Sequence, residues 1–99
     1  MTALRVLTPG DQEDPSWVEA RSVSEIEEFV RAGRTVVVTP ADLAGHDGEA
    51  AELAAASVCA WAGARVFRTT RPEQVRLAVD MTESLAGRRP PALTRRGLA

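Results

Sequence analysis

The chain has 99 residues, of which 44% are hydrophobic and 26% charged, and this predicts one small globular domain. The length excludes a complete (βα)8 barrel, which needs roughly 250 residues, and no apolar stretch approaches the roughly 20 residues of a membrane span. The single cysteine, Cys59, excludes an internal disulfide and is typical of a reducing, cytoplasmic environment.

Charge is distributed unevenly along the chain. All 12 basic residues are arginines, and four of them lie in residues 88–99, which contain no acid. The other eight arginines stand among all 14 acidic residues, so residues 1–87 carry a charge of −6. We therefore predict a single acidic domain over 1–87 and a basic, disordered tail over 88–99. The acidic body argues against nucleic-acid binding, and the tail leaves open a contact with an acidic partner.

Four short segments rich in apolar and β-branched residues predict strands, at residues 4–8, 17–21, 34–40 and 64–70. The third segment contains three consecutive valines, Val36 to Val38, which is typical of a strand buried on both faces. The turn-forming residues between the first two segments predict a loop there.

Three amphipathic segments predict helices, at residues 23–32, 49–62 and 72–86. Each is followed by a glycine suited to a left-handed helix end: Gly33, Gly63 and Gly87. The first two glycines lead into strands within two residues, and such short connections belong to right-handed βαβ units. The predicted fold class is α/β: a small (βα)3 unit, preceded by one more strand, with a mainly parallel sheet of three to four strands.

Capping residues and apolar stripes refine the helices. Ser22 and Glu25 form a capping box, Asp47 is placed to cap the second helix, and Thr70 and Glu73 form a second capping box. One face of the second helix carries Ala50, Leu53, Ala54, Ser57, Val58 and Trp61. Trp61 is either a core anchor or an interface residue. The stripe expected to face the core in the third helix is Val75, Ala78, Val79, Thr82 and Leu85.

The alanine-rich second helix ends at Gly63 and is followed by the run Ala64-Arg65-Val66-Phe67-Arg68-Thr69-Thr70-Arg71. This arrangement resembles the C-terminal end of the dihydropteroate synthase family, the pterin-binding (βα)8 barrels. In that family an alanine-rich seventh helix leads to an eighth strand that closes on an Arg-Val-His-Asp-Val signature. The resemblance covers about 40 residues, from 49 to 87, and implies a related βα architecture.

Departures from the signature bear on activity. Arg68 falls on the signature arginine, whereas Thr69, Thr70 and Arg71 replace its valine, histidine and aspartate. In the family the arginine and histidine help to hold the anionic end of the pterin substrate, and a threonine has no cationic or general-acid character. The family also uses an asparagine and a lysine, and this chain contains neither. The resemblance therefore does not imply synthase activity.

Arg68, Thr70 and Arg71 form the candidate binding site. The carboxyl ends of parallel strands are where open α/β sheets bind ligands, and the third helix begins directly behind these residues. The hypothesis is a site for a small anion such as phosphate. The alternative, which we favour, is that Thr70 caps the helix and that the two arginines are solvated or paired with Asp42 or Glu73.

Two further residues invite a chemical role. His46 lies in a glycine-containing loop beside Asp42 and Asp47, but no further ligands follow at a metal-binding spacing. Cys59 has no histidine near it in the sequence, so we predict a packing role. The sequence contains no complete catalytic set, and we predict no cofactor and no metal.

The function predicted from the sequence is a small, non-catalytic assembly or protein-interaction module related to a fragment of the pterin-binding barrels. A homo-oligomer is expected because a small parallel sheet leaves two open edges and its helices cannot cover both faces. The alternative is a protein, or residual enzyme, that binds phosphate or a pterin-like anion around Arg68. Neither a membrane nor a nucleic acid is expected as a partner.

Overall fold

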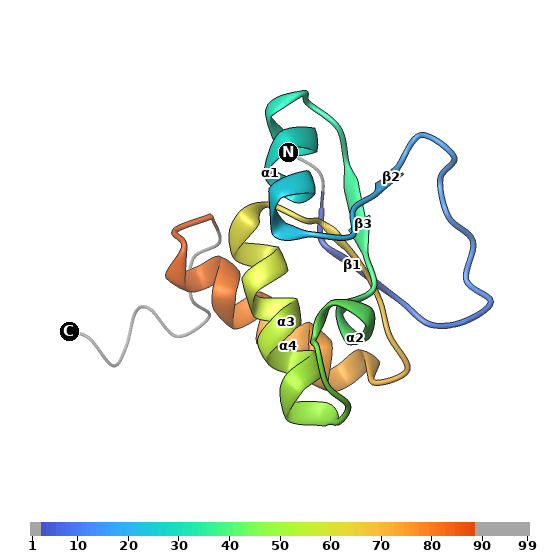
Figure 1. The fold of residues 1–99 in the computed structure, drawn as a ribbon, viewed down its shortest axis with the longest axis vertical. Coiled ribbons are helices and arrows are strands. Elements are labelled where there is room, and N and C mark those ends of the chain that lie inside the picture. Colours follow the sequence, from blue (N-terminus) through green and yellow to red (C-terminus); the bar gives the residue numbers. More distant parts are fainter. Residues whose placement is uncertain (1–2, 89–99) are drawn as a thin grey trace.

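The computed structural model describes residues 3–88 and contains four strands and four helices (Figure 1). In chain order they are β1 (Arg5–Leu7), β2 (Val18–Glu19), α1 (Val23–Arg31), β3 (Val36–Val38), α2 (Pro40–Leu43), α3 (Glu49–Ala62), β4 (Val66–Arg68) and α4 (Pro72–Leu85). Each predicted strand and helix is found, at shorter length for the strands. The short helix α2 was not predicted.

The four strands form one sheet with the order β1-β4-β3-β2, and all three pairings are parallel. Val37 is in register with Val66, and Val66 with Arg5. The α/β prediction with a parallel sheet is therefore confirmed. The first strand lies beside the last one, so the connection from β1 to β2 must travel from one edge of the sheet to the other.

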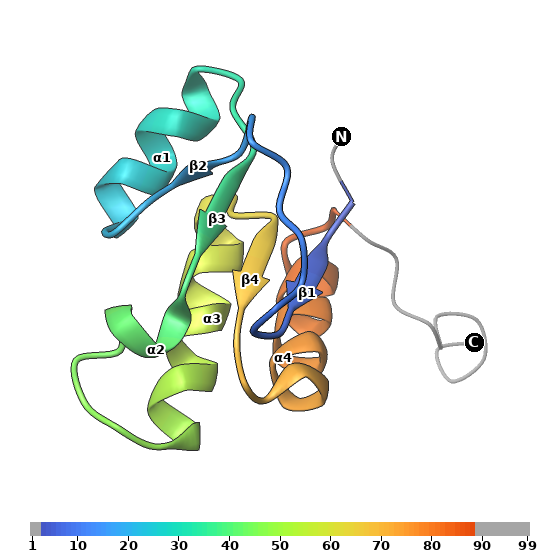
Figure 2. The ribbon, with the colours of Figure 1, turned by 90° about the vertical axis from the view of Figure 1, so that its right-hand side faces the viewer.

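All four helices lie on one face of the sheet, and the β1–β2 connection, residues 8–17, lies on the opposite face (Figures 1 and 2). The units β2–α1–β3 and β3–α3–β4 advance across the sheet in the same direction, and right-handed crossovers then place α1 and α3 on the same side. On the connection side Val37 and Val66 are only 2% and 0% exposed. The sequence predicted that the helices could not cover both faces of the sheet. They cover one face, and this connection covers the other.

The core lies between the sheet and the helices. Val36, Val38 and Phe67 pack there with α3 residues that are small. The buried residues of α3 are Glu52, Ala56, Cys59 and Ala60. The apolar face predicted for this helix is therefore not its buried face, because α3 is apolar on most of its circumference and periodicity cannot select a face.

The core-facing side of α3 is the small one because Phe67, fully buried in the sheet beneath it, needs the room. Val58 and Trp61, on the predicted apolar face, are 52% and 60% exposed, so Trp61 is not a core anchor. On α4 the prediction holds for Val75, Val79 and Thr82, whereas Leu85 is 78% exposed.

One predicted cap is confirmed and two are wrong. The Ser22 hydroxyl accepts a hydrogen bond from the Glu25 amide at 3.1 Å and begins α1. The N-cap of α3 is Gly48 rather than Asp47, and that of α4 is Arg71 rather than Thr70. Both helices begin at the predicted residues, Glu49 and Pro72, and only the residue that precedes each first turn has a different role from the one predicted.

The end of α4 is held by a buried carboxylate. Glu83 is 1% exposed and accepts hydrogen bonds from Arg65 at 2.6 Å and from Arg88 at 2.7 Å. Arg88 also donates to the backbone carbonyl of Ala60 at the end of α3. The residue predicted to begin the tail thus contacts the fold, while the rest of the predicted tail, 89–99, lies outside the described residues.

This ion-pair cluster predicts a pH-dependent contribution to stability. Burial opposes ionisation of Glu83, but hydrogen bonds from Arg88 and Arg65 outweigh it and lower the pKa of this carboxyl. A lowered pKa means that the contribution is present at neutral pH and is lost as the pH falls below the ordinary value of 4.5.

We expect Glu83→Gln to lower the free energy of unfolding at pH 7 by about 2–4 kcal/mol, because it leaves two arginines without their anion. Urea denaturation measures this, and the difference from the native chain should shrink toward pH 3. The control is Arg76→Gln at an exposed pair with Asp80, where the change should stay within about 0.5 kcal/mol. Equal losses in the two variants would contradict the structural role of Glu83.

Candidate functional site

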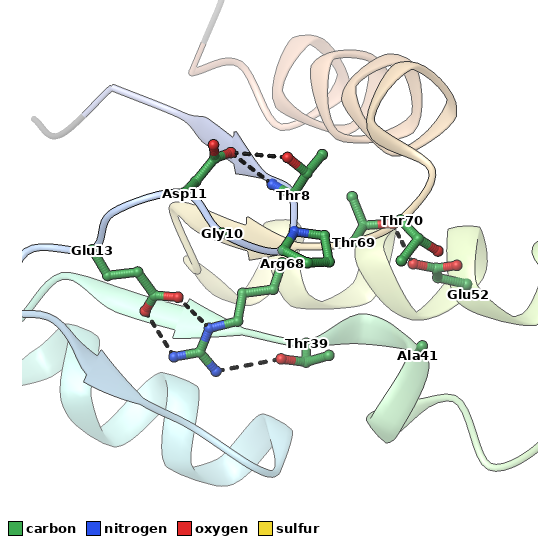
Figure 3. Close-up of a pocket in the computed structure, with 11 residues that line it drawn as sticks. Thr8, Gly10, Asp11, Glu13, Thr39, Ala41, Glu52, Arg68, Thr69 and Thr70 are labelled. Carbon is green, nitrogen blue, oxygen red and sulfur yellow. Dashed lines mark hydrogen bonds and ion pairs between the residues drawn. The ribbon is translucent and has the colours of Figure 1, made fainter.

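A cavity of about 240 Å³ opens at the carboxyl edge of the sheet, between the ends of β1, β3 and β4 and the start of the β1–β2 connection (Figure 3). Thr8, Thr39 and Arg68 reach it from the strand ends, and Asp11 and Glu13 from the connection. This is the place where ligands bind in parallel α/β sheets. The cavity is the strongest candidate for a small-molecule site at the predicted edge.

The Arg68 guanidinium is already occupied by the chain itself. Its Nε and Nη2 donate to the two carboxylate oxygens of Glu13, both at 2.8 Å (Figure 3). Its Nη1 lies 3.4 Å from Glu19 and also 3.4 Å from the Thr39 hydroxyl. The predicted pairing with Asp42 or Glu73 was wrong, because the acid comes from the connection that folds back across the sheet.

The two groups stabilise each other's charged forms. The hydrogen bond from Arg68 lowers the pKa of Glu13, and the hydrogen bond to Glu13 raises the pKa of Arg68 further above its already high value. A planar guanidinium and a carboxylate joined through two parallel hydrogen bonds form the strongest common ion-pair geometry. An external anion at Arg68 would have to displace Glu13.

Arg71 is engaged by a different carboxylate. Its Nη1 donates to Oε1 of Glu52 at 2.8 Å, and the Thr69 hydroxyl donates to Oε2 of Glu52 at 2.5 Å. The Thr69 oxygen also accepts from the Arg71 amide at 2.9 Å. Thr69 therefore satisfies the backbone at the start of α4, which was the role predicted for Thr70.

Glu52, which lines the cavity and binds Thr69 and Arg71, was not predicted from the sequence. Its side chain is buried, although it belongs to a helix with otherwise small apolar buried residues. Glu52 lies four residues before Ala56 and seven before Cys59, on the same side of the helix. Because α3 is apolar on most of its circumference, the sequence alone did not identify this side as the buried one. An acid on that stripe predicts a buried partner.

The predicted site is thus brought together only in part. Arg68 and Thr70 line the same cavity, with Thr70 exposed, whereas Arg71 points to Glu52 and is absent from the cavity lining. Four carboxylates, Asp11, Glu13, Glu19 and Glu52, accompany the two arginines. The region carries no excess of positive charge that would attract an anion.

His46 and Cys59 line a second cavity, of about 520 Å³, between the start of α1, α2 and α3. Burial raises the pKa of the Cys59 thiol to about 11, so the thiol stays protonated and unreactive at neutral pH. Within residues 3–88, no three His, Cys, Asp or Glu side chains are grouped so that they could hold a metal ion. None of the helices in that range combines the length and apolar character needed to cross a membrane.

No protein-family model, curated protein or solved structure matches the chain.

The exchanged roles of the two threonines can be measured with isosteric variants. Thr69→Val removes the donor to Glu52 and the acceptor for the Arg71 amide, so we expect a loss of about 1–3 kcal/mol in the free energy of unfolding. Thr70→Val, at the adjacent exposed position, should change it by less than about 0.5 kcal/mol. Chemical denaturation compares the two, and a larger loss for Thr70→Val would contradict the assignment of Thr69.

Proposed function

We propose that this chain is a non-catalytic protein-interaction or assembly module of the cytoplasm, and a reduced relative of the pterin-binding barrels. The observation that carries the proposal is the set of large apolar side chains left exposed on the helices. They are Val23 and Val30 on α1, Val58 and Trp61 on α3, and Leu77, Met81 and Leu85 on α4.

These side chains form stripes rather than scattered positions. Leu77, Met81 and Leu85 follow each other at intervals of four residues, which places them on one side of α4. Leu77 and Leu85 are 63% and 78% exposed. Three neighbouring helices with apolar outward residues are typical of a surface that binds another protein.

Helix α3 supports the same conclusion. The sequence has no charged residue from 53 to 64, and α3 exposes Val58 and Trp61 on the side opposite its buried residues. A helix that is apolar on both sides is normally covered on both sides. The sheet covers one side of α3, and a partner would cover the other.

The strand order supports the proposed relationship to the barrels. In a closed (βα)8 barrel the first strand pairs in parallel with the last, and the helices all lie outside. Here β1 pairs in parallel with β4, and the helices share one face. A barrel that had kept its first strand and its last three βα units would give this order.

The pairing of the arginines at the carboxyl edge of the sheet supports a non-catalytic role. Arg68 and Arg71 are bound to Glu13 and Glu52, and Thr70 stands where the resembling family has histidine. General acid–base chemistry needs a titratable group near the reacting atoms. The strand-end residues serve the fold instead.

Affinity capture from the native cell tests the proposal. The bait is the tagged chain, and its variant is Leu77→Ser with Leu85→Ser, which makes the α4 stripe polar. We expect a specific protein to be retained by the native bait and by the control Gln74→Ser, an exposed change on the same helix, and to be lost from the double variant. The same captured proteins with all three baits would contradict an apolar interaction surface.

The alternative function is the binding of phosphate or a pterin-like anion at Arg68. It is favoured by the cavity beside that residue, which is lined by four threonines, Thr8, Thr39, Thr69 and Thr70, together with Arg68. It is disfavoured by Glu13, which already fills the guanidinium fork.

A thermal melt with added ligand separates the two functions. We expect phosphate, pyrophosphate and a pterin pyrophosphate to leave the Tm of the native chain unchanged, because they must displace an internal carboxylate. A saturable rise in Tm that weakens with salt and disappears in Arg68→Ala would establish the anion site and displace the leading proposal.

A further inference from the structure

We propose, building on the interaction function above, that the partner is a second copy of this chain. Two copies dock through their α3 helices, which run antiparallel about a two-fold axis near Val58. In this arrangement Trp61 of each copy enters the cavity between α1 and α3 of the other.

The cavity is built to receive a large apolar side chain. It has a volume of about 520 Å³ and an apolar wall of small α3 side chains, Ala51, Ala54 and Ala55, faced by Val23 at the start of α1. Trp61, on the same helix, is 60% exposed. One surface therefore carries both an exposed indole, the knob, and an open apolar cavity. In an isologous interface the knob of each copy can fill the cavity of the other.

The position of the knob along α3 fits that symmetry. The N-terminal half of the outward side has only alanines, and the C-terminal half has Val58 and Trp61. At 1.5 Å per residue, Trp61 lies about 10 Å along the helix from Ala54 and Ala55. Antiparallel pairing centred near Val58 therefore sets each Trp61 against Ala54 and Ala55 of the other copy.

The sideways position fits as well. Ala55 lies on the flank of α3 that lines the cavity beside α1. At 100° per residue, Trp61 lies about 120° around the helix from Ala55, on the flank toward α4, and Ala54 lies between them at the edge of the cavity, about 20° from Trp61. A two-fold axis perpendicular to α3 reverses both the direction along the helix and the direction across it. Knob and cavity are offset in both directions, so one rotation brings them together.

The outer helices join the same contact. The rotation sets α4 of one copy over α1 of the other, because the two helices flank α3 on opposite sides (Figure 2). The stripe of Leu77, Met81 and Leu85 then meets Val23 and Val30, which are 41% and 39% exposed. The arrangement covers every exposed large apolar side chain on the helices of the described chain.

Charge also favours a second copy over an unrelated partner. The chain is acidic, yet α3 has no charge on its outward side beyond its first turn, so two copies can approach there without repulsion. Asp47 and Glu49 stand at the N-terminal end of α3. Arg31 is the last residue of α1, and Arg34, three residues later, lines a cavity with Ala62 and Gly63 at the C-terminal end of α3. Antiparallel pairing brings the acidic end of each copy to the basic end of the other.

Sedimentation equilibrium of the purified chain, with tryptophan fluorescence in a Trp17→Phe background, tests this arrangement. We expect a dimer at micromolar concentration, and a blue shift of Trp61 emission that follows dimer formation. Trp61→Ala removes the knob, and Ala54→Arg blocks the cavity at an exposed helical position. Each should weaken the dimer at least about tenfold, while Gln12→Arg, on the exposed connection, should leave it unchanged.

Mixing the two variants gives the sharpest result. A heterodimer of Trp61→Ala with Ala54→Arg contains one intact knob in one intact cavity, whereas each homodimer contains none. We expect the mixture to dimerise at concentrations where each variant alone is a monomer. Circular dichroism confirms that both variants are folded.

A native chain that stays monomeric near 1 mM, variants that dimerise like the native chain, or a mixture no better than its components would each overturn the proposal. Failure here is distinguishable from failure of the interaction function. A monomer that still captures another protein through Leu77 and Leu85 would overturn the dimer and leave the interaction module in place.

Discussion

The parallel pairing of β1 with β4 is the constraint on which the rest of the structure depends. It puts the first strand at the far edge of the sheet from β2, so the connection between them must cross one whole face. Right-handed crossovers place α1 and α3 on the other face, and α4 lies on that face as well. The connection therefore covers the face of the sheet on which no helix packs. It buries Val37 and Val66, although it contains no helix itself.

The same constraint explains why the arginine at the sheet edge is paired with a carboxylate of the chain itself. Ordering a connection without regular structure costs conformational entropy of its backbone and side chains. A bidentate ion pair can offset part of that cost and hold the connection in place. Glu13 supplies the carboxylate and Arg68 the guanidinium. Two further arginine–carboxylate pairs, of Arg71 with Glu52 and of Arg65 with Glu83, also join different segments. The planar, multidentate guanidinium suits this use better than an ammonium group, and the chain contains arginine only.

The sequence was informative about local structure and much less about pairings between distant segments. The valines of β3, the Ser22 cap and the glycine after each long helix follow from backbone and side-chain properties within a few residues, and all are found. The partner of Arg68 lies 55 residues away in a segment that no periodicity describes. Nothing local distinguishes Glu13 from the other acids of that connection, so the pair could not be predicted before the strand order was known.

The unpredicted buried side of α3 and the proposed dimer have the same physical origin. In a helix with a single apolar side, the sequence identifies the side that is buried. Helix α3 has two apolar sides, one with small side chains and one with larger ones. Phe67 beneath the helix selects the side with Ala56 and Ala60, because a larger residue would hold the helix away from the sheet. That choice leaves Val58 and Trp61 toward solvent on a surface where alanines have left a cavity. A sequence shaped only by the monomer would gain solubility from charge at those positions. The outward side of α3 instead has no charge beyond its first turn and has small side chains at one end and large ones at the other. A second copy that covers this side would explain both features.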